Sequence, residues 1–243
     1  AEGRIKAKHI VFATHYPFIN RPGYFFMKMH QQRSYVAALE NAARLEGMYY
    51  GIDKQDGWSY RNYGNILLLG GAAHRTGVIP DEDPHKKLQK EAHMLWPQCR
   101  EIAFWSAQDC LTADSIPYIG RFSSRRIKWH VATGFQKWGM TSSMVAGKLL
   151  ADQIVGKVQS TDTIFHPARL KAAISLPSII REGLSTAKQL SKGLIGKGPR
   201  CSHLGCGMEW NAYEKIWECP CHGSRFDESG NLIDNPAQSR LKI

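Results

Sequence analysis

Two cysteine–histidine segments near the C-terminal end of this 243-residue chain restrict its fold and chemistry more than any other feature. Four of the six cysteines and two of the ten histidines lie within residues 201–222. The segments are Cys201-Ser-His203-Leu-Gly-Cys206 and Cys219-Pro-Cys221-His222-Gly-Ser224. Thiolates combined with imidazoles are a ligand set that suits zinc or an iron–sulfur centre.

The make-up of the two segments favours an iron–sulfur centre over a structural zinc site. A Cys₂His₂ zinc site needs four ligands, yet each segment carries one further cysteine, Cys206 or Cys221. Each also carries a glycine, Gly205 or Gly223, which lets the backbone approach a bulky inorganic centre because it has no Cβ. In a mixed-ligand [2Fe–2S] centre two thiolates hold one iron and two histidines hold the other. Zinc remains the alternative.

The pattern resembles the Rieske ferredoxin signature, Cys-x-His-x-Gly-Cys followed by Cys-x-Cys-His-x-Ser. The resemblance implies a pair of ligands for the buried iron, a pair for the outer iron, and a disulfide that braces the two loops. In that order, the implied pairs are Cys201 with Cys219, His203 with His222, and Cys206 with Cys221.

Two neighbouring residues bear on the reduction potential of such a cluster. Hydrogen bonds to the cluster sulfurs raise the potential because they stabilise the added electron. Ser224 matches the family's hydroxyl donor to a bridging sulfide, whereas Phe226 stands where high-potential respiratory members carry a tyrosine. One donor instead of two predicts a lower potential than in respiratory Rieske proteins.

The base of this domain is expected to be abbreviated. Residues 185–200 are rich in lysine and glycine and lack an alternating strand pattern. The last strand is expected at residues 231–233.

Composition limits the remaining possibilities. Hydrophobic residues make up 43% of the chain, enough for a sizeable core and two domains. Neither a long apolar run nor a signal peptide is present, so we expect a cytoplasmic protein. The net charge is −1 over residues 199–243 and +12 over residues 1–198, but no nucleic-acid motif accompanies it, which argues against nucleic-acid binding. Cys99 and Cys110 are expected to be ordinary buried thiols.

The first expected strand spans residues 8–13. It is apolar on both faces, as in a parallel sheet, and the small residues Ala13 and Thr14 follow it. A parallel strand needs partners, and no strand or Gly-x-Gly-x-x-Gly nucleotide motif precedes this one. We therefore expect the chain to be a fragment or a processed form.

Residues 21–110 show the spacing of an antiparallel sheet, with short strand-like runs separated by turn residues. The expected strands are residues 24–29, 33–38, 47–51, 59–63, 65–71 and 102–106. Residues 81–98 predict a helix, with Asp81 and Asp83 near its start and Pro97 at its end.

A strand, a glycine-containing loop and a helix follow. The strand is expected at residues 127–134 and the amphipathic helix at about 142–155, with Gly156 as its stop. The free N–H groups at the helix start, near Thr141, form a site for a carbonyl or negatively charged oxygen.

This part resembles the C-terminal half of the D-amino-acid oxidase/sarcosine oxidase superfamily of FAD enzymes. The matching segments are Asp-x-x-Pro-x-Ile-Gly (114–120), Ala-Thr-Gly-Phe-x-x-Trp-Gly-Met-Thr (132–141) and Ala-Gly-Lys-x-x-Ala-Asp (146–152), with residues 10–14 similar to an earlier strand. The resemblance implies that the loop and the helix start face the flavin pyrimidine carbonyl. The implied flavin contacts are Ala13, Thr14, Gly134, Phe135, Gly139, Met140 and Thr141.

The two resemblances imply an α+β chain: a partial FAD-binding α/β domain, an antiparallel substrate-domain sheet, and a small β-rich Rieske domain. The expected boundaries are 1–166 for the oxidoreductase part (flavin domain 1–20 and 111–166, sheet 21–110), 167–198 for a linker and 199–243 for the Rieske domain. The linker is basic and amphipathic. We expect Pro177 to split any helix in it and its apolar residues to pack on the protein itself, with membrane-surface contact less favoured.

The implied function is an FAD-dependent oxidoreductase that takes hydride from a C–H bond next to an amine, as in an amino acid. The cluster would pass single electrons between flavin and a carrier protein or quinone, in either direction, which favours a dehydrogenase over an oxidase. Candidates for the substrate pocket are Arg61, Tyr63, His74 and Arg75. The alternatives are a Rieske electron-transfer module on a flavin-free docking scaffold and a zinc-stabilised interaction protein.

Overall fold

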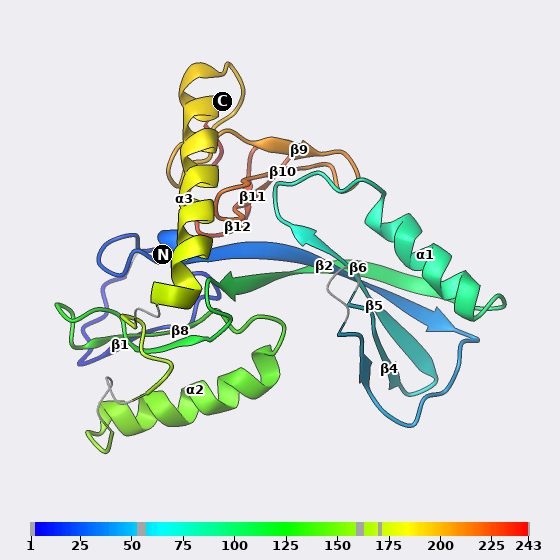
Figure 1. Ribbon diagram of the computed structural model, residues 1–243, viewed down its shortest axis with the longest axis horizontal. Coiled ribbons are helices and arrows are strands. Elements are labelled where there is room, and N and C mark those ends of the chain that lie inside the picture. The colour runs from blue at the N-terminus through cyan, green and yellow to red at the C-terminus, as the bar shows by residue number, and fades with distance from the viewer. Residues whose placement is uncertain (1–2, 53–56, 159–162, 170–171, 243) are drawn as a thin grey trace.

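The computed structural model describes residues 3–52, 57–158, 163–169 and 172–242. The fold is α+β, as expected, and consists of two sheets and a smaller C-terminal domain (Figure 1). Among the described residues, no helix combines the length and the apolar character needed to cross a bilayer.

A three-stranded sheet covered by one helix corresponds to the expected flavin-domain part. β1 (Ile10–Phe12) pairs in parallel with β8 (Trp129–Thr133), which pairs antiparallel with β7 (Tyr118–Arg121). Helix α2 (Gly139–Ile154) packs on β7 and β8. The expectation that β1 is buried on both faces is wrong, because α2 packs on the other two strands. The first two residues of β1 are 42% and 44% exposed.

A five-stranded antiparallel sheet forms the largest layer. In spatial order its strands are β3 (Tyr49–Tyr50), β4 (Ser59–Tyr63), β5 (Ile66–Arg75), β2 (Met29–Glu40) and β6 (Arg100–Thr112). Helix α1 (Pro84–Leu95) is capped by Asp83 and packs on β2 and β5. Leu88 of α1 joins Leu39 and Leu69 of the sheet in one core. The expected helix and most of the expected strands are confirmed, with shifted ends.

One expected strand, at residues 24–29, is wrong. The chain forms instead a single 3₁₀ turn, η1 (Phe25–Met27), before β2 begins at Met29. Gly23 and Tyr24 both have positive φ, 118° and 50°, so the chain turns there and cannot extend. The turn buries Phe25 against Phe122.

The C-terminal domain contains a four-stranded antiparallel sheet. In spatial order its strands are β12 (Leu232–Asp234), β11 (Arg225–Asp227), β10 (Ile216–Glu218) and β9 (Glu209–Asn211). The expected last strand is confirmed within one residue. Buried Met208, Phe226 and Leu241 pack with the cysteines in one core.

A single helix, α3 (Ala172–Ile195), precedes this sheet. The expectation that Pro177 splits any helix here is wrong. Pro177 is the sixth residue of α3, and the helix continues through it although proline supplies no N–H to the hydrogen-bond ladder. At the other end of α3 the carbonyl of Gln189 accepts a 3.0 Å hydrogen bond from Gly207 N. The expected linker therefore contacts the C-terminal domain directly.

The C-terminal domain lies on the same side of the large sheet as α1, beside β2 and β6, whereas α2 lies on the other side (Figure 1). Gln31 and Arg33 of β2 are buried at this contact. The cysteine–histidine segments thus face the end of the large sheet and the loop that follows β1.

Candidate metal centre and its contacts

Two loops of matching geometry carry the cysteine–histidine segments. In each loop the first cysteine donates its N–H to the carbonyl five residues later, Cys201 to Cys206 and Cys219 to Ser224, both at 2.9 Å. In each, the glycine four residues on donates back to that cysteine at 2.9 Å. Gly205 and Gly223 have φ of 85° and 83°, so both loops need glycine for this turn.

Cys201 and Cys219 are fully buried and free of disulfides. Their thiols hydrogen-bond to each other. The hydrogen bond from Cys219 lowers the pKa of Cys201 to about 7, whereas the same bond and burial raise the pKa of Cys219. The pair thus presents one sulfur that ionises readily, and a thiolate is the form that binds metal.

His203 and His222 lie together, with ring centroids 5.0 Å apart at 89°. Burial lowers the pKa of His203 to about 4, and burial with the nearby His203 charge lowers that of His222 to about 3. Both imidazoles are therefore neutral at pH 7, which is the state that binds metal.

The outer ring nitrogens of the two histidines fix the tautomer. Nε2 of His222 lies 3.1 Å from the carbonyl oxygen of Phe26, and Nε2 of His203 lies 2.6 Å from Oδ1 of Asn20. Both oxygens are acceptors, so each Nε2 carries the proton. Each Nδ1 is buried and has no partner among the described residues. Two free lone pairs beside two free thiols fit a two-cysteine, two-histidine centre.

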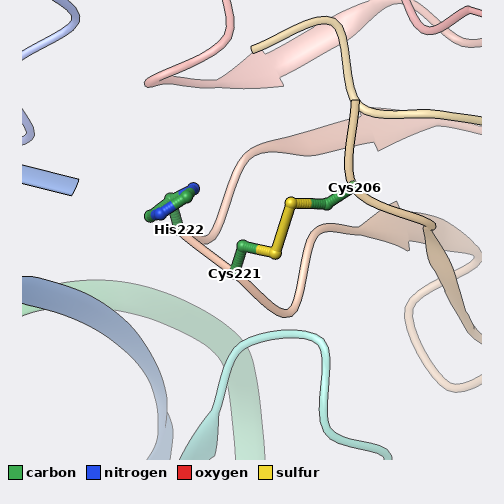
Figure 2. A group of neighbouring side chains, drawn as sticks. All are labelled: Cys206, Cys221 and His222. Carbon is green, nitrogen blue, oxygen red and sulfur yellow. A yellow bond between two sulfur atoms is a disulfide. The ribbon is translucent and has the colours of Figure 1, made fainter. Parts of the chain in front are cut away.

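A second grouping includes the remaining cysteines. Figure 2 shows Cys206, Cys221 and His222, whose possible ligand atoms lie within 4.8 Å of one another. Cys206 and Cys221 form a disulfide, so neither sulfur is available as a thiolate. The disulfide instead joins the two loops, as the family resemblance implied.

The surroundings of the sulfurs agree with the expected hydrogen-bond donor. The Ser224 side chain is fully buried and hydrogen-bonds the Cys201 sulfur. Its oxygen accepts a 3.0 Å bond from Ala237 N, so its proton is free to point at sulfur. Phe226 is also fully buried and supplies no donor.

Gln31 of β2 connects the second loop with the rest of the chain. Its amide nitrogen donates to the carbonyls of His222 at 2.6 Å and Asn235 at 3.2 Å. Its amide oxygen accepts from Gln108 of β6 at 2.8 Å. Gln108 in turn donates to the carbonyl of Gly223 at 2.8 Å.

A buried charge network lies beside these amides. Arg33, which is 0% exposed, pairs with Glu214 and lies 3.7 Å from Glu218. The hydroxyl of Tyr35 donates to Glu214 at 2.7 Å, and Gly77 N donates to Glu218 at 2.8 Å. Burial favours the neutral form of Glu214, but Arg33 and Tyr35 outweigh it and lower its pKa. Burial raises the pKa of Glu218 despite Arg33.

Sequence reasoning missed Gln31, Arg33 and Gln108. The sequence did contain a signal for them. Gln31 and Arg33 occupy every second position of β2 and so share one face with Tyr35, Ala37 and Leu39. Polar residues that continue a buried apolar stripe need polar partners.

The residues expected to contact the flavin lie at one edge of the small sheet. β1 and β8 are parallel, so Ala13 and Thr14 emerge beside Gly134, and Thr133 bonds the carbonyl of His15 across the gap. Gly134, Phe135, Gly139, Met140 and Thr141 follow on the loop and first turn of α2. This helix starts at Gly139, three residues before the expected start, and has no side-chain cap. Its first N–H groups are therefore available to a ligand.

The four expected substrate-pocket residues lie in two places. Arg61 and Tyr63 are exposed on β4, whereas His74 and Arg75 lie at the far end of β5. Arg61 pairs with Leu68, so roughly 20 Å of strand separates it from His74. His74 stacks on Tyr35, and Arg75 donates to the carbonyls of Pro220 and Cys221. Their catalytic role stays a prediction.

A further pair of charges lies on the other face of β2 and β6. Ser34 donates to Asp109 at 3.1 Å, and Asp109 interacts with Lys137 of the expected flavin loop. Burial raises the pKa of Asp109 and lowers the pKa of Lys137. The opposite charge of each residue counteracts the pKa shift of its partner. Sequence reasoning also missed this pair.

Comparison with known proteins identifies both parts of the chain. Residues 1–153 match the family described as FAD dependent oxidoreductase (DAO), and residues 187–243 match the Rieske [2Fe-2S] domain. The chain belongs to the FAD dependent oxidoreductase family and carries a Rieske domain at its C-terminal side. These domains imply FAD and a [2Fe–2S] cluster as cofactors, and the donor set described above fits the cluster.

Among individual relatives, YhfW of Bacillus subtilis (strain 168), described as a Rieske 2Fe-2S iron-sulfur protein, is 34% identical over 98% of this chain and 55% of its own length. The cytochrome b6-f complex iron-sulfur subunit 3 of Nostoc sp. is 32% identical over 40% of this chain and 55% of its own. The chain thus spans about half the length of these relatives.

Two solved structures share the fold. Glycine oxidase from Bacillus cereus ATCC 14579 has a TM-score of 0.53 at 17% identity, covering 65% of this chain and 46% of its own. Iminodiacetate oxidase from Chelativorans sp. BNC1 has a TM-score of 0.50 at 14% identity, covering 71% and 47%. At these identities the likeness concerns the fold.

Proposed function

We propose that the protein is an FAD-dependent amine or amino-acid dehydrogenase or oxidase in which a Rieske cluster, held in place against the flavin domain, exchanges single electrons with a carrier. The cytoplasmic location expected from the sequence stays a prediction, as do the expected domain boundaries.

The proposed ligands are Cys201 and Cys219 for one iron and Nδ1 of His203 and His222 for the other. The neutral imidazoles, with protonated Nε2 atoms bonded to Asn20 and Phe26, support this assignment. The proposed flavin contacts lie in the glycine loop (the loop after β8 that begins at Gly134) and at the start of α2, together with Ala13 and Thr14. When bound, the flavin accepts two electrons as hydride and the cluster carries one electron at a time.

One observation carries this proposal: Gln31 joins the cluster loop to both expected flavin segments. It bonds the carbonyls of His222 and Asn235, and Asn235 donates to the carbonyl of Thr14 at 2.9 Å. It also accepts from the thiol of Cys110, whose carbonyl accepts from Gln136 in the glycine loop at 3.1 Å. This short set of contacts, buried at Gln31 and exposed at Thr14, supports a direct connection between the two proposed cofactor-binding regions.

The position of the histidines bears on the carrier. Asn20 and Phe26 of the oxidoreductase part cover the Nε2 atoms of both imidazoles. In this arrangement a carrier protein or quinone exchanges electrons at another surface, and the histidine side of the cluster serves the flavin.

The shared fold with proteins described as glycine oxidase and iminodiacetate oxidase supports the proposal of an amine or amino-acid substrate. Lys137 and Asp109, opposite charges beside the expected flavin loop, are the residues that we propose to interact with such a substrate.

The test uses protein purified with both cofactors. The flavin is photoreduced anaerobically, and the electron paramagnetic resonance signal of the reduced cluster is followed in time. Gln31→Met removes a buried amide and leaves the carbonyls of His222 and Asn235 unpaired, at about 1–3 kcal/mol. We expect the signal to appear more slowly, because the weakened contact no longer holds the cluster loop at a fixed distance from the expected flavin segments.

Gln32→Met is the matched control because Gln32 is the neighbouring, partly exposed amide on the other face of β2. Equal rates in wild type and both variants would contradict the proposed connection. Protein that contains the cluster but never binds FAD would instead support the alternative, a Rieske electron-transfer module on a flavin-free scaffold.

A further inference from the structure

A pocket of about 660 Å³ lies beside the loop that touches the cluster histidines. Asn20 and Phe26 of this loop contact His203 and His222, and Arg21 to Tyr24 between them line the pocket. The β7–β8 loop, including Ser123 to Arg126, forms another wall. The pocket is separate from the expected flavin contacts, which lie at the opposite ends of β1 and β8.

Every charged residue that lines the pocket is positive. The lining includes Arg21, Lys28, Arg125 and Arg126, and no aspartate or glutamate. Burial and then the neighbouring Arg169 lower the pKa of Lys28 to about 8, with Asp114 opposing. Asp114 is itself paired with Arg169 by two 2.8 Å bonds. An anion in this pocket would therefore meet uncompensated positive charge in a partly desolvated setting.

Unpaired donors accompany the charge. The Ser123 hydroxyl oxygen is buried and has no hydrogen-bond partner among the described residues. A buried polar atom without a partner costs free energy unless a ligand satisfies it. Within the described part of the chain, Arg21 and Arg125 likewise have no ion-pair or hydrogen-bond partner. Arginine forks bind the oxygens of a phosphate group in pairs.

The size and shape of the pocket indicate the kind of ligand that it can hold. A concave volume of this order suits a small molecule, and Tyr24 and Phe122 give it an apolar wall. We propose that this pocket binds the phosphate group of a small organic phosphate ester.

Isothermal titration calorimetry of the cofactor-loaded protein tests the proposal, with inorganic phosphate and adenosine monophosphate as probes and chloride at equal ionic strength as reference. We expect saturable binding of both phosphates with one site. In the double variant Arg21→Gln/Arg125→Gln affinity falls about tenfold or more, and in Ser123→Ala about threefold.

The control is Lys86→Gln/Lys90→Gln, which removes the same charge from exposed positions on α1. Because Arg21 and Arg125 are exposed, their variants should keep the wild-type melting temperature. Equal weakening in the control, or heat only at low ionic strength, would mean general attraction to a basic protein and would overturn the proposal.

Two further experiments distinguish a lipid headgroup, a soluble ester and an acidic protein as the ligand. Vesicles containing phosphatidic acid that compete with adenosine monophosphate would place the phosphate on a lipid headgroup, and absence of competition would place it on a soluble ester. Binding of an acidic carrier protein that needs Arg21 and Arg125, with no phosphate binding, would overturn the proposal in favour of a protein-docking surface.

Discussion

The cluster side and the flavin side of this molecule are built differently. On the cluster side Gln31 and Arg33 are at most 1% exposed, and Gln31 has polar partners on both the sheet and the Rieske loops. On the flavin side Trp138, Met140 and Met144 are 59%, 87% and 77% exposed. The two cysteine–histidine loops are therefore held by buried contacts within the chain, whereas the flavin side presents exposed apolar side chains. Substitutions should accordingly have larger effects on the cluster side.

The largest effect is expected from Cys219→Ser. Loss of one thiolate from the proposed ligand set should abolish the cluster, with no electron paramagnetic resonance signal after anaerobic reduction and no bound iron. Cys99→Ser, at another buried free thiol, should leave both unchanged. Full iron content in the Cys219 variant would mean that the ligand assignment is wrong.

Arg33→Met should come next. It leaves the buried Glu218 without its cation, while the half-buried Glu214 keeps only Arg225 at 3.8 Å, and breaking a buried pair in this way typically costs about 3–5 kcal/mol. Chemical denaturation measures the loss. Met140→Ala on the flavin side should stay within about 0.5 kcal/mol. If Arg33→Met/Glu214→Gln is no more stable than Arg33→Met, the pairing does not carry the effect.

Removal of the disulfide should cost about 3 kcal/mol, the value for a loop of roughly 15 residues. Cys206 and Cys221 are 15 residues apart. The double variant Cys206→Ser/Cys221→Ser is compared with wild type by urea denaturation, with and without reductant. A reductant effect that persists in the double variant would point to a different bond.

Acid should weaken the cluster side through Glu214. Its pKa lies below the usual 4.5, so its ionised form stabilises the fold above that pH, and the contribution is lost as pH falls through the lowered pKa. A tenfold difference in proton affinity between the folded and unfolded chain corresponds to about 1.4 kcal/mol of stability. Thermal unfolding from pH 6 downward should show a shallower loss of stability for Glu214→Gln than for wild type. Parallel curves would remove Glu214 from this role.

The smallest expected effect is on the reduction potential. Phe226→Tyr adds a possible donor at a buried position near the cluster sulfurs. A hydrogen bond worth about 1 kcal/mol should raise a one-electron potential by roughly 40 mV. A redox titration measures this change, and Phe226→Leu should not produce it. A wild-type potential in the respiratory range would contradict the expectation of a single donor.

The cysteine–histidine loops and the helix α2 could be predicted from the sequence because their determinants are local. Ligand spacing, a glycine with positive φ at a fixed place in each loop, and an apolar helical stripe all lie within a few residues of each other. The two family resemblances, which the comparisons confirm, rest on these same local motifs.

The contacts of Gln31 and Arg33 could not be predicted, since their partners lie 191 and 181 residues away in sequence. No local pattern specifies which polar group meets another across a domain contact. The prediction of a strand at residues 24–29 was wrong for the opposite reason. Their strand-like composition is local, but the left-handed turn at Gly23 and Tyr24 and the burial of Phe25 outweigh it.

Two glycines face each other's domains across the contact. A Cβ at Gly77 of the oxidoreductase part would collide with Pro220, and a Cβ at Gly223 of the Rieske loop would come within 2.7 Å of Gln31. Each domain therefore carries a glycine at the point where the other domain packs too closely for a Cβ. A Rieske domain transplanted from another protein would therefore need a glycine opposite Gln31 and a backbone that fits against Gly77 as Pro220 does.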